Sequence, residues 1–217
     1  MRESAAKAGS VYPAVMPSSP LSAAHDDYFL QYVAVSREFD GWAREDIFKH
    51  LLDGKRVLHI GYADWPITDP AQNLHVVLDG VCSQLDGYDV HDEADADLRP
   101  LVSGRLIHDW TEVEDTYDTV IVPEVIEHVD NVREFLEQLA TLDAKEIVIT
   151  APDALACRHA HFDVDMSAEA VVEVVHPDHN YWFSPYTLAN VVSKYTDWNI
   201  LGMWAVNRIS IMLRAEM

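Results

Sequence analysis

The sequence predicts an α/β fold in which a mostly parallel sheet carries helices on both faces. From residue 56 onward, short apolar or β-branched runs alternate with segments of helical periodicity. This alternation is typical of parallel strands joined by helical crossovers. Two further strand-like segments, 198–205 and 208–215, follow each other around a turn at 206–207. They predict a closing hairpin, and therefore one antiparallel strand at the edge of the sheet.

The expected elements follow in order along the chain. The predicted strands before the hairpin are 56–60, 83–90, 105–108, 117–122 and 146–150. A helical pattern extends from 26 to 52, and the later predicted helices are 71–78, 94–102, 131–142 and 184–194. Apolar residues at i, i+3, i+4 and i+7 make 131–142 the best defined helix. Ser184 and Pro185 form a typical helix start. Residues 152–182, which hold four histidines, are expected to be irregular.

Length and charge limit the possible architectures. The 217 residues predict a single domain over residues 23–217, preceded by a flexible tail over 1–22 that is rich in Ala, Ser and Pro. The formal net charge is −22, with 15 basic against 37 acidic residues. Two explanations stay open, a well-solvated acidic surface and an adaptation to high salt. In either case the sequence shows no basic patch of the kind that a nucleic-acid-binding protein needs.

The sequence also predicts a cytoplasmic protein without membrane contact. It contains no run of 18 apolar residues and no signal-peptide pattern at its start. Its two cysteines, Cys82 and Cys157, are far apart and are expected to be reduced thiols.

The most informative segment spans residues 117–129, YDTVIVPEVIEHV. A β-branched strand ends there at Pro123 and is followed at once by Glu124, Glu127 and His128. Ligands of open α/β sheets bind where strands end and helices begin. An imidazole at such a rim can act as a general base, so His128 is the first candidate and His179 the second. The alternative role for His128 is structural, capping the helix that follows.

The same segment permits a metal site. If a helix begins at Glu124, then Glu124, Glu127 and His128 share one helical face at i, i+3 and i+4. Two carboxylates and an imidazole could then bind a divalent cation, with His176 or His179 completing the set. The sequence leaves both possibilities open, a divalent-metal site and a metal-free site in which His128 acts alone.

Three features are consistent with a nucleoside cofactor. Gly61 ends the first strand, where a ligand can approach the backbone, but Ala63 replaces the second glycine of a dinucleotide fingerprint, which disfavours a nicotinamide. An acid at the end of the second strand can bind ribose hydroxyls, and Asp89 is favoured over Asp79. After the third strand, Asp109 could bind an adenine amino group, and Trp110 could cover the ring. Their alternative roles are a loop acid and a half-buried tryptophan.

In this order, the features resemble the class I S-adenosylmethionine-dependent methyltransferases, over about residues 45 to 215. The segment 117–129 is similar to their fourth-strand motif in the branch that reads EVIEHV, and 176–188 resembles the segment after their fifth strand. The resemblance implies a Rossmann-like methyltransferase fold of seven strands, mostly parallel, with the last strand antiparallel. It also implies cofactor contacts from one set of residues: Gly61, Tyr62, Ala63, Asp89, Asp109, Trp110, Pro123 and Glu124.

The implied activity is transfer of a methyl group from S-adenosylmethionine to an oxygen atom of a small molecule or saccharide. In-line methyl transfer needs an aligned nucleophile and an acceptor for its proton. Within the resembled family, EVxEH clusters bind magnesium in some members, including small-RNA 2′-O-methyltransferases. Two other interpretations therefore stand beside the first, a magnesium-dependent RNA 2′-O-methyltransferase and a non-catalytic binding module of the same shape.

Overall fold

A computed structural model describes residues 31–64, 69–113 and 116–217. The predicted tail at 1–22 and the Trp65–Pro66 part of the first loop lie outside these residues. The proposed extent of the domain, 23–217, therefore remains a prediction.

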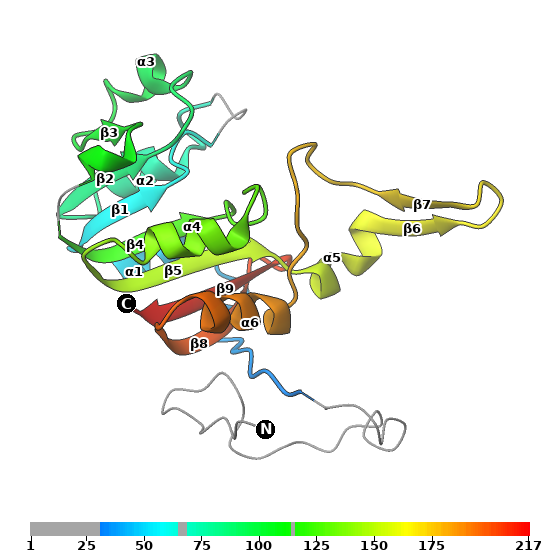
Figure 1. The fold of residues 1–217 in the computed structure, drawn as a ribbon. Coiled ribbons are helices and arrows are strands. Elements are labelled where there is room, and N and C mark those ends of the chain that lie inside the picture. The colour runs from blue at the N-terminus through cyan, green and yellow to red at the C-terminus, as the bar shows by residue number, and fades with distance from the viewer. Residues whose placement is uncertain (1–30, 65–68, 114–115) are drawn as a thin grey trace.

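The core of the molecule is a seven-stranded sheet in the order β3-β2-β1-β4-β5-β9-β8 (Figure 1). Its strands are β1 Arg56–Ile60, β2 Gln84–Tyr88, β3 Leu106–Ile107, β4 Tyr117–Pro123, β5 Ala144–Pro152, β8 Asn199–Val206 and β9 Ser210–Glu216. The first five of these pair in parallel, and β9 runs antiparallel to both of its neighbours. The predicted parallel sheet with an antiparallel last strand is confirmed.

The sequence predicted an antiparallel strand at the edge of the sheet. In the structure the antiparallel strand, β9, lies one position inside the edge. The second strand of the hairpin, β9, pairs with β5, and this places β8 at the edge. β9 is the more deeply buried of the two strands because it has a neighbour on each side.

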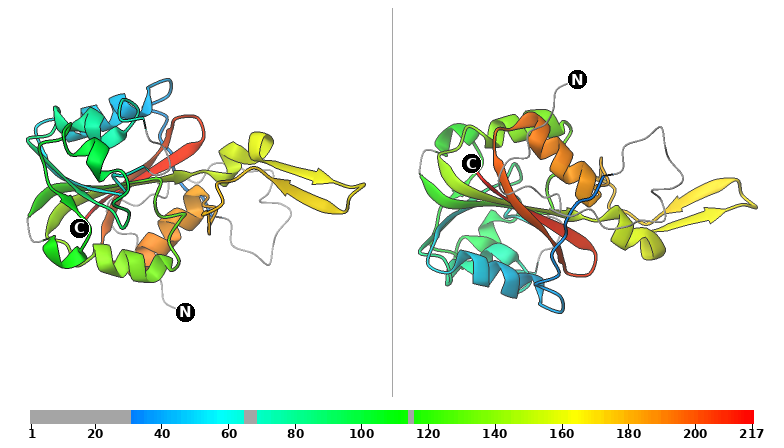
Figure 2. Two further views of the ribbon diagram at one scale, coloured as in Figure 1. Left: turned by 90° about the horizontal axis from the view of Figure 1, so that it is seen from above. Right: turned by 90° about the horizontal axis from the view of Figure 1, so that it is seen from below.

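Helices cover both faces of the sheet, as predicted (Figure 2). They are α1 Arg44–Leu52, α2 Leu74–Asp79, α3 Asp95–Leu98, α4 Val132–Leu139, α5 Ala154–His161 and α6 Pro185–Tyr195. On one face, Phe48 of α1 and Leu78 of α2 share a buried apolar cluster with the sheet. On the other face, Leu136 of α4 and Leu188 of α6 share a second cluster. Ser184 forms the expected N-cap, a capping box with Thr187. No helix in the three described ranges is both long and apolar enough to cross a membrane.

The helical pattern predicted from residue 26 to 52 is wrong over its first half as far as the structure describes it. Residues 31–43 contain no helix, and only Arg44–Leu52 is helical. The backbone of Ser36 pairs with the edge strand β8, donating to Met203 O at 2.8 Å and accepting from Ala205 N at 2.9 Å. Gly41, at φ 83°, then turns the chain into α1. Pairing with a distant strand outweighs the local helical pattern here.

The irregular region predicted at 152–182 contains regular structure. It holds α5 and a separate two-stranded sheet of β6 Phe162–Asp165 and β7 Ala170–Glu173, which projects away from the body (Figures 1 and 2). Both strands of this hairpin are largely exposed. Each strand has only four residues, which is the lower limit of the length over which alternation indicates a strand.

Candidate functional site

The strand order of the sheet reverses between β1 and β4, whose neighbours β2 and β5 lie on opposite sides of the pair. Ligands of open α/β sheets bind at the carboxyl ends of the strands at this point. Gly61 follows β1, Asp89 follows β2, and Glu124 follows β4. The fold thus brings three of the predicted residues to one edge of the sheet.

The glycine after β1 makes its close contact with the protein itself. Gly61 has a φ of 81°, and a Cβ at this position would overlap the Cγ2 atom of Val125. Its N–H donates to Tyr88 O at 2.8 Å. The space that the missing side chain provides is therefore filled by Val125.

The side chains of Tyr62 and Ala63 belong to the core, since both are fully buried. The Tyr62 hydroxyl donates to Asp95, and burial together with this carboxylate raises the tyrosine pKa far above its usual value. The Ala63 N–H donates to Asp89 Oδ2 at 3.0 Å. The loop after β1 is thus joined directly to the acid that follows β2.

Of the two candidate ribose acids, only Asp89 stands at the carboxyl edge. Its side chain accepts one hydrogen bond per oxygen, from Ala63 N and from His91 N at 2.9 Å. A carboxylate has about four lone-pair positions, so about half of its acceptor capacity remains. Asp79 ends α2, ahead of β2, and binds Ser103 N at 2.8 Å. It therefore lies toward the opposite edge of the sheet.

Asp109 and Trp110 follow β3 and begin a short 3-10 helix. The Asp109 carboxylate caps this helix by accepting from Thr111 N at 2.9 Å and from Thr111 Oγ1 at 2.7 Å. Trp110 packs edge-on against Tyr88 at the end of β2, with ring centroids 4.9 Å apart. The indole thus stands beside the strand that leads into Asp89.

The helix start at Glu124, the condition for the possible metal face, is not found in the structure. Pro123 ends β4, Glu124 takes a left-handed φ of 55°, and residues 126–128 form only a turn. Without a helix, Glu124, Glu127 and His128 do not share a helical face, and Glu124 is not part of the group of potential ligands that Glu127 forms with His128 and His179.

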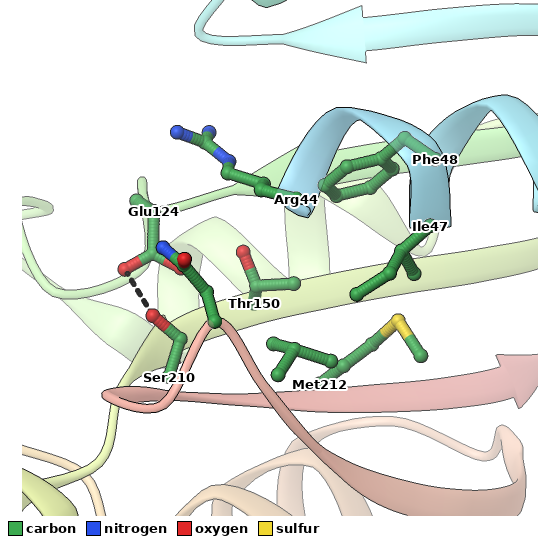
Figure 3. A pocket seen from close by; sticks show the side chains of 9 residues that line it. Arg44, Ile47, Phe48, Glu124, Thr150, Ser210 and Met212 are labelled. Carbon is green, nitrogen blue, oxygen red and sulfur yellow. Dashed lines mark hydrogen bonds between the residues drawn. The ribbon is translucent and has the colours of Figure 1, made fainter. Parts of the chain in front are cut away.

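Glu124 instead lines a small cavity under α1 (Figure 3). It accepts a hydrogen bond from Ser210 Oγ at 3.3 Å. Thr150 and Arg44 line the same cavity, which has room for about one water molecule. Burial raises the pKa of Glu124, while the neighbouring guanidinium acts against this rise.

Arg44 is a candidate that sequence reasoning missed. It is the first residue of α1, and its guanidinium extends toward Glu124 (Figure 3). Its Nε atom is buried without a hydrogen-bond partner. No motif marks Arg44, and only the rarity of basic residues in this chain could have drawn attention to it.

Glu127, His128 and His179 form the candidate reactive cluster. One potential ligand atom from each lies within 4.8 Å of the others. Both carboxylate oxygens of Glu127 are buried without a hydrogen-bond partner. Burial, with a smaller effect from the Glu124 charge, raises the pKa of Glu127 to about 9. His179 joins the cluster although it lies 51 residues further along the chain.

The histidines of this cluster are in contact with one another. The rings of His128 and His179 have centroids 4.5 Å apart, and that of His176 lies 5.5 Å from His128. Burial lowers the pKa values of His128 and His179, and the neighbouring imidazoles lower them further. Both rings are therefore neutral near pH 7 and able to accept a proton or bind a metal.

Asn180 fixes the two histidine-bearing segments together. Its backbone N–H donates to Glu127 O at 2.8 Å, and its side-chain amide donates to His128 O at 2.8 Å. The segment after α5 is thus folded back onto the turn after β4, which explains why residues so distant in sequence meet.

Comparison with known proteins shows what this arrangement resembles. No protein-family model and no curated protein matches the chain. Among solved structures, the Pnkp1/Rnl/Hen1 RNA repair complex matches with a TM-score of 0.54 at 15% identity, over 80% of this chain and 41% of that chain. An S-adenosylmethionine-dependent methyltransferase from Mesorhizobium loti matches with a TM-score of 0.53 at 12% identity, over 82% and 100%.

A third structure in this group is the magnesium protoporphyrin IX methyltransferase of Synechocystis with S-adenosylhomocysteine. It matches with a TM-score of 0.53 at 18% identity, over 79% of this chain and 81% of that chain. At sequence identities this low, the similarity to these structures shows the fold alone. Together with the strand order, it shows that the chain has the Rossmann-like fold of the S-adenosylmethionine-dependent methyltransferases.

Proposed function

We propose that this protein is an S-adenosylmethionine-dependent methyltransferase that methylates an oxygen atom of a small molecule or saccharide. One observation carries the proposal. A buried acid, Asp89, follows β2, and the neutral His128 follows β4 at the same edge of the sheet, around the point where its strand order reverses. The neutral His179, from the segment after β7, packs against His128.

The residues at this edge fit the cofactor. Asp89 retains acceptor capacity for ribose hydroxyls, and Trp110 beside it suits an adenine ring. The unpartnered Nε of Arg44 suits the carboxylate of the methionine moiety. Pro123 and Glu124 then stand at the sulfonium end. When bound, S-adenosylmethionine supplies an electrophilic methyl group, and the protein needs only to align an acceptor and take up its proton.

His128 is the proposed general base and His179 its alternative. A neutral imidazole near pH 7 can accept the proton of a hydroxyl group as the oxygen is methylated. The contact between the two rings lets either histidine orient the other. Asn180 holds the backbone of His128 and thereby positions its ring.

A metal-assisted form of the same reaction is the second candidate, and Glu127 is the observation that favours it. A buried carboxylate with no hydrogen-bond partner is costly unless it takes up a proton or binds a cation. Glu127, His128 and His179 could provide one oxygen and two nitrogen ligands to a divalent ion. Such an ion would orient the acceptor oxygen and favour its deprotonation.

The charge of the chain favours a neutral acceptor. At a net charge of −22, the protein repels an anionic polymer at long range. An RNA end, the acceptor in the magnesium-dependent alternative, would have to approach against this field. A sugar or another neutral hydroxyl compound carries no such cost.

Calorimetric titration with S-adenosylmethionine and S-adenosylhomocysteine tests the proposal. We expect wild type to bind both, and Asp89→Asn to bind them at least ~10-fold more weakly, a loss of about 1.4 kcal/mol. Asp79→Asn is the matched control and should bind normally. If wild type shows no binding heat at about 1 mM cofactor, a concentration that detects even weak sites, the protein is not such an enzyme. Binding without turnover on hydroxyl acceptors would favour the non-catalytic module.

A further inference from the structure

The hairpin of β6 and β7 has no role in the proposed reaction, yet apolar and acidic residues alternate along β6. We propose that the free edge of β6 binds an extended segment of another protein, in which basic residues alternate with apolar ones. The segment would add a third strand to the hairpin.

The hairpin projects away from the body of the molecule (Figures 1 and 2). It exposes apolar side chains. Val164 is 58% exposed, Val171 74% and Met166 81%. Two strands alone are marginally stable in water, and an unpaired edge is a template for another strand. Exposed valines that lie together on such a hairpin therefore indicate a binding surface, whereas single exposed apolar residues elsewhere do not.

Within β6, the apolar and the acidic side chains lie on opposite faces, while β7 places Glu173 opposite Phe162 and Val172 opposite Asp163. Directly opposed residues of an antiparallel pair share a face of the sheet. Val164 stands opposite Val171 and shares its face with Phe162, whereas Asp163 and Asp165 alternate with them on the other face. β6 therefore presents an alternating apolar and acidic edge, and the complementary strand alternates apolar and basic residues.

The outer edge of β6 is free of strand pairing. Within the part of the chain that the structure describes, β6 pairs only with β7. The N–H of Val164 donates at 2.8 Å to the carboxylate of its neighbour Asp163 instead of to another strand. An incoming strand would accept from this N–H and release the carboxylate for a lysine or arginine.

The base of the hairpin is fixed to the body. Trp182 packs on Phe162 with ring centroids 4.7 Å apart, and its indole N–H donates to Glu173. The Val174 N–H donates to His161 O at 2.8 Å. Trp182 also lies 5.9 Å, centroid to centroid, from His179. The base of the hairpin therefore lies next to the candidate reactive cluster, and the rest of β6 extends away from it.

Charge identifies the partner. Residues 162–175 contain four carboxylates and no Lys or Arg. A second copy of this chain would bring the same charges, and nowhere in the sequence do Lys or Arg alternate with apolar residues over four positions. The occupant is therefore a segment of a different, basic protein, bound by strand addition.

Fluorescence anisotropy with two labelled peptides tests this inference. One peptide alternates Val and Lys, and the other has the same composition with its lysines grouped. We expect wild type to bind the alternating peptide at least about fivefold more tightly, because only that peptide places every lysine beside an aspartate. In Asp163→Asn/Asp165→Asn the preference should disappear, while the asparagine oxygen can still accept from Val164 N–H. Asp92→Asn/Asp97→Asn, which removes equal charge elsewhere, should retain it.

Equal binding of the two peptides by wild type would mean that only diffuse charge acts, and would overturn the inference. So would a preference that survives in Asp163→Asn/Asp165→Asn. Sedimentation provides a third readout. A wild-type dimer that Val171→Asp converts to a monomer would assign the hairpin to self-association instead.

Discussion

Gly61 and Val125 are in direct contact at the point where the strand order of the sheet reverses, and the isopropyl group of Val125 occupies the place of a Cβ at residue 61. This contact joins the loop after β1 to the turn after β4. It also explains why a glycine stands there without the other glycines of a dinucleotide fingerprint.

Gly61→Ala should destabilise the fold by about 2–4 kcal/mol, because the new Cβ meets Val125 and the left-handed φ of 81° is strained for alanine. Urea denaturation measures the change. Val125→Ala introduced beside it should recover part of the loss, since it removes the overlap but not the backbone strain. Gly80→Ala is the control, as its φ of −83° and open surroundings accept a side chain. Equal losses at both glycines would contradict the role of Val125.

His59 and His75 predict a loss of stability in mild acid. The two buried rings share a 3.2 Å contact between their Nδ1 atoms. Burial lowers the pKa of His75 to about 4 and that of His59 well below 6.5. The unfolded chain takes up these protons below pH 6.5 and the folded chain does not, so stability falls as the pH drops from about 6.5 toward 4.

The expected loss is at most about 2 kcal/mol per histidine on going from pH 6.5 to about pH 5. Urea titrations at several pH values measure it. The double variant His59→Leu/His75→Leu replaces both polar partners and should flatten the profile. His91→Leu, at an exposed histidine, should leave the slope as it is. A wild-type slope that the double variant also shows would assign the acid sensitivity to other groups.

Glu127 should oppose stability in the absence of metal. Its pKa of about 9 in the folded state exceeds the usual 4.5, so stability falls as the pH rises between these values. Glu127→Gln should therefore stabilise the metal-free protein at pH 7 by about 1–3 kcal/mol. The same variant should lose the rise in Tm that Mn²⁺ gives to wild type.

Exposed Glu134 provides the control. Glu134→Gln should retain the Mn²⁺ effect and show no gain in stability. If Mn²⁺ leaves the Tm of wild type unchanged while Glu127→Gln is still more stable, the carboxyl group is a buried neutral acid and the metal-assisted reaction is wrong.

His128→Ala should lower the turnover of a hydroxyl acceptor by about 100-fold or more, the usual effect of removing a general base, while the affinity for S-adenosylmethionine stays nearly unchanged. Single-turnover kinetics and calorimetry separate the two quantities. His179→Ala is the comparison. Unaltered turnover in His128→Ala together with a loss in His179→Ala would transfer the proton-acceptor role to His179.

Much of the fold follows from local pattern. The strands that became β1 and β4 are apolar runs long enough to be recognised alone, because a parallel strand buries both of its faces. The capping box at Ser184 fixes the start of α6 through contacts four residues apart at most. Asp89 was favoured for the same kind of reason, since it directly follows a strand. β6 and β7 have four residues each, too few for a local pattern to identify them as strands.

The sequence by itself determined the class of fold, the strand ends and the chemical types gathered at them. Only the tertiary structure decided which of these groups meet. Glu124 and Glu127 are close in sequence, yet the chain takes a left-handed φ at Glu124 and forms no helix that would align them, whereas Asn180 brings His179 to His128 from beyond α5. Local pattern cannot specify such contacts, because they depend on how two distant segments pack and on whether a buried group finds a partner.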